Sequence, residues 1–318
     1  MKIGTKCGFK KEQLLCSIEK GLPFLEFHTN IEDFSGDIDF KEIKYILDKN
    51  NVKCHAVHAP IADSLGRKET ITIGTFYTEQ RKENIELFKK CIQLANFLCD
   101  TETPIVVSHI GTGYKLSDKT RNKFTREHID TILNDAKEDL IIINNYIKEH
   151  YPNTIFVVEN MPNMAYSANN EPYSWYFGQK EDLANFIINL NLENIKTCLD
   201  ICHLTTTMRI DKMHNPFIEK TLSDYIKAYS SSLKLVHLNN CVNLGEITPY
   251  HSQPFNSDSQ NDLELLEEFF KGITSNNIDC FITLEINETD YLTQTNCDKT
   301  ITCVNKVLAS LGLSMSSK

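Results

Sequence analysis

Eight short apolar runs alternate along this chain with longer segments in which apolar residues recur at helical spacing. Runs of this length predict strands, and strands that alternate with helices predict a parallel sheet with crossover helices. Eight such units are the number that closes a (β/α)8 TIM barrel, an α/β fold with eight parallel strands and outer helices. The predicted strands are Lys2–Gly4, Phe24–Phe27, Lys53–Val57, Ile105–Ser108, Ile155–Val158, Thr197–Leu199, Leu233–His237 and Phe281–Leu284.

The segments between these runs predict the helices of the barrel. In Glu79–Leu98, Ile85, Phe88, Ile92 and Ala95 form one apolar stripe. No repeat or linker-like tract interrupts the pattern, so we expect residues 1–318 to form a single TIM-barrel domain in which about the last six residues fray. The other predicted helices are Lys11–Lys20, Phe40–Asn50, Arg126–Glu149, Gln179–Leu190, Phe217–Ser230, Asp262–Thr274 and Thr300–Leu311.

The connections that follow the predicted strands are longer than those that follow the helices. Long loops after the strands mark the functional face of a TIM barrel, at the C-terminal ends of its strands. We therefore expect the site at that face. The long connections are His58–Tyr77, Ile110–Thr125, Met161–Phe177, Leu204–Pro216 and Leu238–Asn261.

The composition suits a globular protein with a sizeable core, since 41% of the residues are hydrophobic and 24% are charged. A net charge of −10 argues against a surface that binds polyanions everywhere, but it does not exclude nucleic acid at a cation-filled site. The eleven cysteines include no C-x-x-C pair, so we expect them to be reduced and mostly buried. With no apolar signal region and no apolar run of membrane-spanning length, the sequence predicts a cytoplasmic or nucleoplasmic protein that is neither secreted nor membrane-spanning.

Polar side chains stand at or just after the ends of six predicted strands. Taken singly, a pair such as Asp200 and His203 is more often a strand-end cap and a satisfied histidine, but parallel strands would bring the whole set to one rim. A carboxylate after several apolar strand residues, such as Glu159 or Glu285, must be paired, liganded or protonated if it points inward. Imidazoles and carboxylates together suit Zn²⁺, Mn²⁺ or Fe²⁺, and their number suits two or three ions. The candidate metal ligands are His58, His109, Glu159, Asp200, His203, His237, His251 and Glu285.

Two kinds of side chain in the long loops are candidates for binding substrate. The aromatic residues of Met161–Phe177 would stack on a base or a sugar, or else form a lid packed on other loops. Basic residues after His109 and His203 would meet phosphates at the metal rim, or else form solvated loops. We expect Cys198 and Cys202 to be small buried hydrophobes rather than thiolate ligands. The substrate-binding candidates are Lys115, Lys119, Arg121, Arg209, Lys212, Tyr173 and Trp175.

Two motifs, Cys198-Leu-Asp-Ile-Cys-His203 and His237-Leu-Asn-Asn240, carry a family resemblance. From about residue 22 to about residue 290 the chain resembles the endonuclease IV-like (apurinic/apyrimidinic endonuclease family 2) branch of the xylose-isomerase-like TIM barrels. The resemblance implies three metal ions held at the strand ends. It implies a first set of ligands in His58, His109 and Glu159, a second in Glu159, Asp200, His237 and Glu285, and a third in His203 and His251.

The chain departs from that family's pattern in the third set. Where the family has D-R-H, this sequence reads Pro249-Tyr-His251, which removes one carboxylate and leaves Glu246 as the nearest substitute. The glycine-rich turn that follows D-R-H in the family is also absent. The resemblance is therefore stronger for the metal ligands than for the DNA-binding loops.

The leading hypothesis is a metal-dependent phosphodiesterase that acts on nucleic acid, resembling an apurinic/apyrimidinic endonuclease that cleaves abasic DNA. Two or three divalent ions, expected to be zinc with manganese or iron as alternatives, would activate a bridging water for attack on phosphorus. Glu159 and Glu285 are the predicted catalytic carboxylates.

Two alternatives remain open at this point. A sugar or sugar-phosphate isomerase or epimerase would need one ion, held by Glu159, Asp200, His237 and Glu285, with paired carboxylates moving a proton. A multi-iron enzyme that oxidises a peptide is the third possibility.

Overall fold

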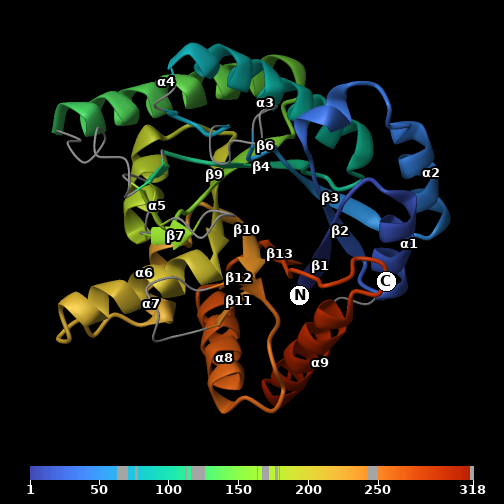
Figure 1. Cartoon of the computed structure of the whole chain (residues 1–318), viewed down its shortest axis with the longest axis vertical. Helices are drawn as coiled ribbons and strands as arrows, with labels where there is room; N and C mark the ends of the chain where they lie inside the picture. The colour runs from blue at the N-terminus through green and yellow to red at the C-terminus, as the bar shows by residue number, and fades with distance from the viewer. Residues whose placement is uncertain are drawn as a thin grey trace.

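Eight parallel strands close into a barrel in this computed structural model, with helices around it (Figure 1). The predicted TIM-barrel fold is therefore confirmed. Neighbouring strands follow the order β1-β13-β10-β9-β6-β4-β3-β2, and β1 closes the ring by pairing with both β2 and β13. The barrel strands are β1 (Lys2–Cys7), β2 (Phe24–His28), β3 (Lys53–His58), β4 (Ile105–His109), β6 (Ile155–Glu159), β9 (Ile195–Asp200), β10 (Leu233–Leu238) and β13 (Phe281–Leu284).

The structure describes residues 1–62, 71–75, 78–111, 113–115, 126–162, 164–166, 172–175, 178, 180–242 and 250–315. Each barrel strand contains its predicted run, and most extend one to three residues further. The N-terminus lies beside the last described segment, where the Met1 amino group donates a hydrogen bond to the carbonyl of Ser314 at 3.0 Å. Both ends of the described chain lie near β1 and α9 (Thr295–Ser310) (Figure 1).

The helices around the barrel occupy the predicted segments, apart from one extra helix after β9 and the start positions of two others. No helix among the described residues is long and apolar enough to cross a membrane. The helices are α1 (Lys11–Glu19), α2 (Phe40–Lys49), α3 (Thr78–Leu98), α4 (Arg126–His150), α5 (Lys180–Leu190), α6 (Ile201–His214), α7 (Leu222–Tyr229), α8 (Gln260–Ser275) and α9 (Thr295–Ser310), with a 3-10 turn at Ile31–Phe34.

Helix α6 occupies a segment that the sequence predicted as a loop. Asp200 caps it, because its carboxylate accepts a hydrogen bond from the backbone N–H of His203 at 2.7 Å. The run Thr205-Thr-Thr disfavours a helix, but the hydroxyls of Thr205 and Thr206 donate to carbonyls four residues back within α6. The place of α6 in the tertiary structure thus overrides the weak helix propensity of its threonines.

Two further helix boundaries were predicted incorrectly. Helix α7 starts at Leu222 rather than Phe217, because Thr221 and Asp224 form a capping box there. Helix α9 starts at Thr295, five residues before the predicted start.

Short strands form in three of the long connections on the site face. Strands β5 (Gly113–Lys115), β8 (Pro172–Trp175) and β7 (Met164–Tyr166) form a three-stranded antiparallel sheet, and β11 (Asn240–Val242) pairs with β12 (Tyr250–Gln253). The sheet joins the loop after β4 to the loop after β6, and the β11–β12 pair carries His251.

Apolar side chains pack on both sides of the barrel strands. Ala56, Ile105, Val107, Val157, Cys198 and Leu235 fill the barrel interior, and a larger cluster packs between the strands and the helices. Burying each of the valine, leucine and isoleucine side chains among them stabilises the fold by roughly 1.5–3 kcal/mol. The polar residues of the site lie at the C-terminal ends of the same strands.

The cysteines follow the prediction with one exception. Nine of the eleven are free and buried. Cys202 and Cys241 form a disulfide with a Cα–Cα distance of 5.4 Å, which corrects the prediction that all are reduced and that Cys202 is only a small buried hydrophobe. The pairing joins residues 39 apart in sequence, so it depends on the contact between α6 and β11.

Candidate metal centre

The register of the barrel brings the strand-end residues together. His109 on β4 lies opposite Glu159 on β6, and His237 on β10 lies opposite Asp200 on β9. Since all eight strands are parallel, these ends share one rim. All eight candidate ligands are brought together there, in overlapping groups whose possible ligand atoms lie within 4.8 Å of one another.

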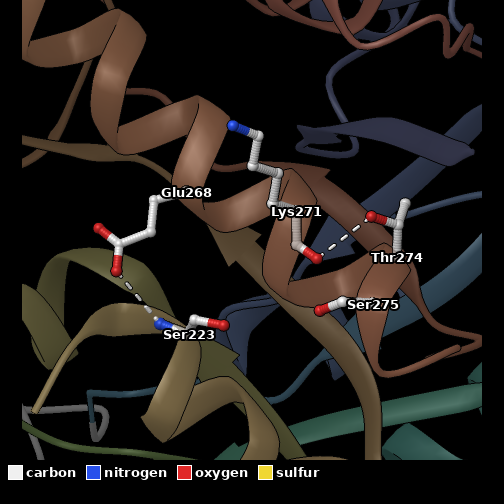
Figure 2. Close-up of a pocket in the computed structure, with 5 residues that line it drawn as sticks. All are labelled: Ser223, Glu268, Lys271, Thr274 and Ser275. Atoms are coloured by element: carbon white, nitrogen blue, oxygen red, sulfur yellow. Dashed lines mark hydrogen bonds between the residues drawn. The ribbon is translucent and has the colours of Figure 1, made fainter.

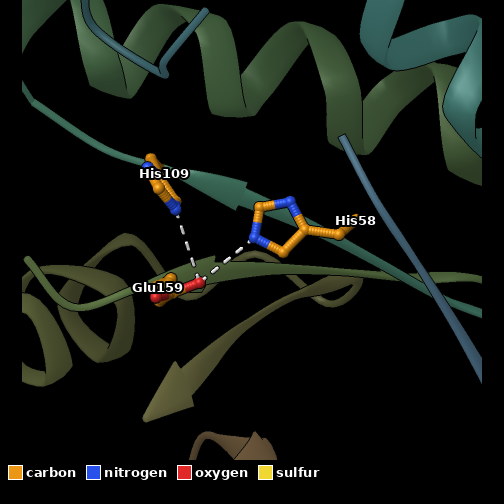
Figure 3. Close-up of side chains that lie close together, drawn as sticks. All are labelled: His58, His109 and Glu159. Carbon is orange, nitrogen blue, oxygen red and sulfur yellow. Dashed lines mark hydrogen bonds and ion pairs between the residues drawn. The ribbon is translucent and has the colours of Figure 1, made fainter. Parts of the chain in front are cut away.

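His58, His109 and Glu159 form the first group (Figure 3). The Nε2 atoms of His58 and His109 lie 3.4 and 3.6 Å from the same oxygen, Oε2 of Glu159. The Nδ1–H of His58 donates to the carbonyl of Ala59 at 2.7 Å, which fixes the ring with its Nε2 towards the carboxylate. Two imidazoles that face one carboxylate oxygen form a suitable set of ligands for a divalent ion.

Asp200, His237 and Glu285 form the second group. The Nδ1 of His237 lies 3.1 Å from Oε2 of Glu159 and 3.5 Å from Oε2 of Glu285, yet it has no hydrogen-bond partner among the described residues. The other ring nitrogen, Nε2, lies 3.0 Å from a carboxylate oxygen of Glu26 and donates to it. A buried ring nitrogen thus faces two carboxylates, and a cation, either a proton on Nδ1 or a metal ion, would satisfy all three groups.

The charges in this group explain its pKa values. Burial would lower the pKa of His237, but Cys198 and the surrounding carboxylates raise it well above its usual value. Burial also opposes ionisation of Glu159, yet His237 and His109 bring its pKa well below the usual range. A bound divalent ion would supply the positive charge that a proton on His237 otherwise supplies.

Asp200, His203 and His251 form the third group. His251 Nε2 lies 3.2 Å from Oδ2 of Asp200, and the rings of His203 and His251 stack with centroids 4.6 Å apart. The Nδ1–H of His203 donates to the carbonyl of Asn160 at 2.7 Å. Glu246 and Pro249, which bear on the predicted departure in this group, lie outside the described residues.

Lys6 and Asn239 support the carboxylates but were missed in the sequence. The ammonium of Lys6 lies 2.8 Å from Oε1 of Glu285. The amide of Asn239 donates to Oδ2 of Asp200 at 2.8 Å and to Oε2 of Glu285 at 3.2 Å. The predicted first strand stopped at Gly4, which left Lys6 out, whereas Asn239 lies within a motif already noted.

Glu26 was also missed, although its sequence carried a signal. It is a fully buried carboxylate within the apolar strand Phe24–His28, and it accepts from His237 and from the hydroxyl of Thr283 at 2.7 Å. A carboxylate inside a predicted strand indicates an inward-facing partner by the same argument used for Glu159.

The predicted substrate-binding residues have varied outcomes. Trp175 is only 6% exposed, so its indole does not present a face to solvent. Arg209 and Lys212 lie on α6, where Arg209 is partly buried and Lys212 is exposed. Lys119 and Arg121 lie outside the described residues, as do the side chains of Lys115 and Tyr173, so these predictions stay untested.

A pocket of about 590 Å³ lies between helices α7 and α8 (Figure 2). It is lined by Ser223 of α7 and by Glu268, Lys271, Thr274 and Ser275 of α8. Glu268 accepts a hydrogen bond from the backbone N–H of Ser223, so the pocket is a groove between two packed helices. None of the candidate ligands contributes to it.

The fold and the polar rim define a class: a (β/α)8 barrel with candidate metal ligands on its C-terminal face. A model of the family described as xylose isomerase-like TIM barrel matches residues 18–301. The chain belongs to the xylose isomerase-like TIM barrel family.

Solved structures with different activities share this fold. A 3-keto-D-glucoside 4-epimerase from E. coli matches with a TM-score of 0.65 and 13% identity, covering 95% of this chain and 98% of the other. An AP endonuclease, family 2, from Brucella melitensis matches with a TM-score of 0.63 and 13% identity, covering 97% and 98%. Endonuclease IV from Thermus thermophilus matches with a TM-score of 0.59 and 14% identity, covering 96% and 100%.

A search of curated proteins gives no match. At these identities the structural likeness defines the fold, and the activity has to be argued from the site.

Proposed function

We propose that this chain is a metal-dependent phosphodiesterase that acts on nucleic acid, with abasic DNA as its substrate. The observation that carries the proposal is the approach of His58 and His109 to Oε2 of Glu159, the oxygen that His237 approaches from another strand. One carboxylate between two sets of imidazoles suits a bridge between two ions. Paired ions are common in enzymes that cleave phosphodiesters.

The residues divide naturally between such ions. His58, His109 and Glu159 would hold the first. Asp200, His237 and Glu285, with Glu159 shared, would hold the second. His203 and His251, whose rings stack beside Asp200, would contribute to a third. Zinc fits this mixture of nitrogen and oxygen ligands, and when bound it supplies Lewis acidity that activates a water and offsets phosphate charge.

The other side chains fix the geometry of this ligand set. Glu26 holds the ring of His237 through Nε2, so that Nδ1 faces Glu159 and Glu285. Asn239 donates to both Asp200 and Glu285 and so fixes their separation. Glu159 and Glu285 are the proposed catalytic carboxylates, because each would face both the ions and the reacting groups.

A second candidate function uses only part of this set. A sugar isomerase or epimerase would need one ion, held by Glu159, Asp200, His237 and Glu285. The similar fold of the 3-keto-D-glucoside 4-epimerase supports this second candidate function. Under that reading His58 and His109 would not hold an ion. The two functions therefore differ in what His58 and His109 do.

Replacing each of these two histidines with asparagine separates the candidates. We expect His58→Asn and His109→Asn to lower the cleavage of a duplex with an abasic-site analogue by about 100-fold or more, because loss of an ion forfeits several kcal/mol of charge stabilisation. The measurement is strand incision by the zinc-loaded protein, with ketose epimerisation assayed in parallel. His150→Asn, on the exposed face of α4, is the matched control.

Two outcomes would reject the phosphodiesterase proposal. The first is no incision of abasic DNA by the zinc- or manganese-loaded wild-type protein. The second is sugar epimerisation that survives both His58→Asn and His109→Asn, which would favour the isomerase.

A further inference from the structure

A cysteine joins the third group of candidate ligands. The sulfur of Cys202, a carboxylate oxygen of Asp200 and a ring nitrogen of His251 lie within 4.8 Å of one another. Cys202 and Asp200 are buried, with 1% and 0% exposed, whereas the His251 side chain is partly exposed, so the group is open to solvent on the His251 side. A thiolate, an imidazole and a carboxylate are three ligands that Zn²⁺ accepts, with its fourth position left open.

The same sulfur is also the one bonded to Cys241. Cys202 lies in the first turn of α6 and Cys241 lies on β11, so the disulfide joins the two elements next to Asp200 and His251. A sulfur in a disulfide cannot act as a thiolate ligand. The disulfide and a thiolate–metal bond therefore exclude each other at Cys202.

The surroundings of Cys241 suit a free thiol as well as a disulfide. The hydroxyls of Thr205 and Thr206 each lie 3.6 Å from its sulfur, and the carbonyl of Cys202 lies 3.3 Å away. These groups can accept from and donate to a thiol. If the disulfide is reduced, the Cys241 thiol therefore still has these hydroxyls and this carbonyl as polar partners.

Asn239 fixes this group from the other side. Its carbonyl oxygen accepts from the backbone N–H of Cys202 at 3.0 Å, while its amide donates to Asp200 at 2.8 Å. One side chain thus positions both the start of α6 and the carboxylate, whatever the state of the sulfur. The ligand set is therefore held in place before an ion binds.

We propose that Cys202 is a thiolate ligand of a metal ion together with Asp200 and His251, and that the Cys202–Cys241 disulfide is the state in which this ion is excluded. This inference rests on the metal centre of the proposed function, but it requires neither phosphodiester cleavage nor sugar isomerisation. A dithiol reductant converts the disulfide state into the thiolate state, and the oxidised (disulfide) form of such a compound reverses the step. The S–S bond breaks, the reductant supplies two electrons and two protons and becomes a disulfide, and the Cys202 thiol loses its proton as the ion binds.

Cobalt substitution tests the proposal without any assay of activity. Co²⁺ replaces Zn²⁺ in such sites, and only a thiolate ligand gives an intense sulfur-to-cobalt charge-transfer band in the near ultraviolet. We expect this band in the full-length protein after treatment with dithiothreitol and removal of the reductant, and we expect it to disappear on reoxidation. Bound Co²⁺ should fall by about one equivalent per chain at the same time.

Three alanine variants assign the band to one sulfur. Cys241→Ala leaves Cys202 without a disulfide partner, so we expect the band with or without reductant. Cys202→Ala should lack the band in both conditions. Cys198→Ala is the matched control, because the sulfur of Cys198 also lies near candidate ligands, those of His237 and Glu159, and this variant should keep the band of the reduced wild type.

Several outcomes would overturn the proposal: a band that survives Cys202→Ala, a band that is lost in Cys198→Ala, or the same Co²⁺ content in the oxidised and reduced wild type. Circular dichroism of each variant excludes unfolding as the cause, and Cys241→Ala keeps the test decisive if Cys202→Ala does not fold. Failure of the phosphodiesterase proposal leaves the band unchanged, so the two failures are distinguishable.

Discussion

Glu26 is the residue through which we expect the barrel interior to control metal affinity. It accepts from His237 Nε2 at 3.0 Å and from the hydroxyl of Thr283 at 2.7 Å, and it is fully buried. Removing its charge weakens the basicity of His237 without removing the ring. Partners that orient a ligand in this way typically contribute 10–100-fold to metal affinity.

We therefore expect Glu26→Gln to weaken zinc binding by roughly 10–100-fold, measured by competition with a chromophoric chelator. Glu12→Gln, at an exposed position on α1, serves as the control and should bind zinc as the wild type does. Equal affinities of Glu26→Gln and the wild type would show that the contact does not orient His237.

His55 gives the barrel interior a predicted dependence on pH. Its Nε2–H donates to Thr283 at 2.8 Å, and burial lowers its pKa to about 4. Because the pKa in the folded state is below the usual 6.5, the neutral ring contributes stability above pH 6.5. That contribution is lost as the pH falls from 6.5 towards 4.

The difference between the two pKa values corresponds to about 3 kcal/mol for the fully buried ring. His55→Gln keeps a donor for Thr283 but does not titrate. Between pH 6.5 and pH 4 we therefore expect the unfolding free energy of the wild type to fall by about 3 kcal/mol more than that of the variant. Urea unfolding of the metal-free proteins at both pH values measures the difference. Parallel curves for the two proteins would mean that another buried histidine accounts for the pH dependence.

At the scale of elements, the junction of β9 and α6 combines a structural and a functional role in Asp200. Its Oδ1 caps α6 and its Oδ2 faces His251. Asparagine caps a helix about as well as aspartate, whereas replacement of a cap by alanine costs about 1 kcal/mol. The two substitutions therefore separate the cap from the ligand.

We expect both Asp200→Asn and Asp200→Ala to lower zinc content, but only Asp200→Ala to lose a further contribution of about 1 kcal/mol to the unfolding free energy of the metal-free protein. Metal analysis and urea unfolding provide the two measurements. If Asp200→Asn keeps the full metal content, Asp200 is a helix cap and not a ligand.

At the scale of the whole molecule, the net charge of −10 means that attraction for DNA must be local. Lys212 lies exposed on α6, the helix that begins at the metal centre, whereas Lys299 lies exposed on α9. We expect Lys212→Gln to reduce the salt dependence of binding to an abasic duplex by up to about one phosphate equivalent, and Lys299→Gln to leave it unchanged. Fluorescence anisotropy over a range of salt concentrations measures both. Identical slopes for the two variants would remove α6 from the predicted DNA-binding surface.

The sequence by itself determined the eight strands and the rim at which they end. Alternation of apolar runs with helical stripes is a local pattern, and each barrel strand contains its predicted run. Six of the eight candidate ligands follow from the same pattern, because a polar residue at the end of a parallel strand lies at the common rim whatever the twist of the barrel. His203 and His251 lie on α6 and β12, beyond the barrel strands. His58, Glu159 and Glu285 could be located in this way before any contact was known.

Only the tertiary structure decided which residues from different strands meet inside the barrel. Glu26 meets His237 across 211 positions of sequence, and Lys6 meets Glu285 across 279. Helix α6 forms despite its threonines, and Cys202 pairs with Cys241 because α6 packs against β11. These contacts depend on the closure and register of the barrel, which are long-range properties, whereas periodicity in the sequence reports only which face of its own element a residue occupies.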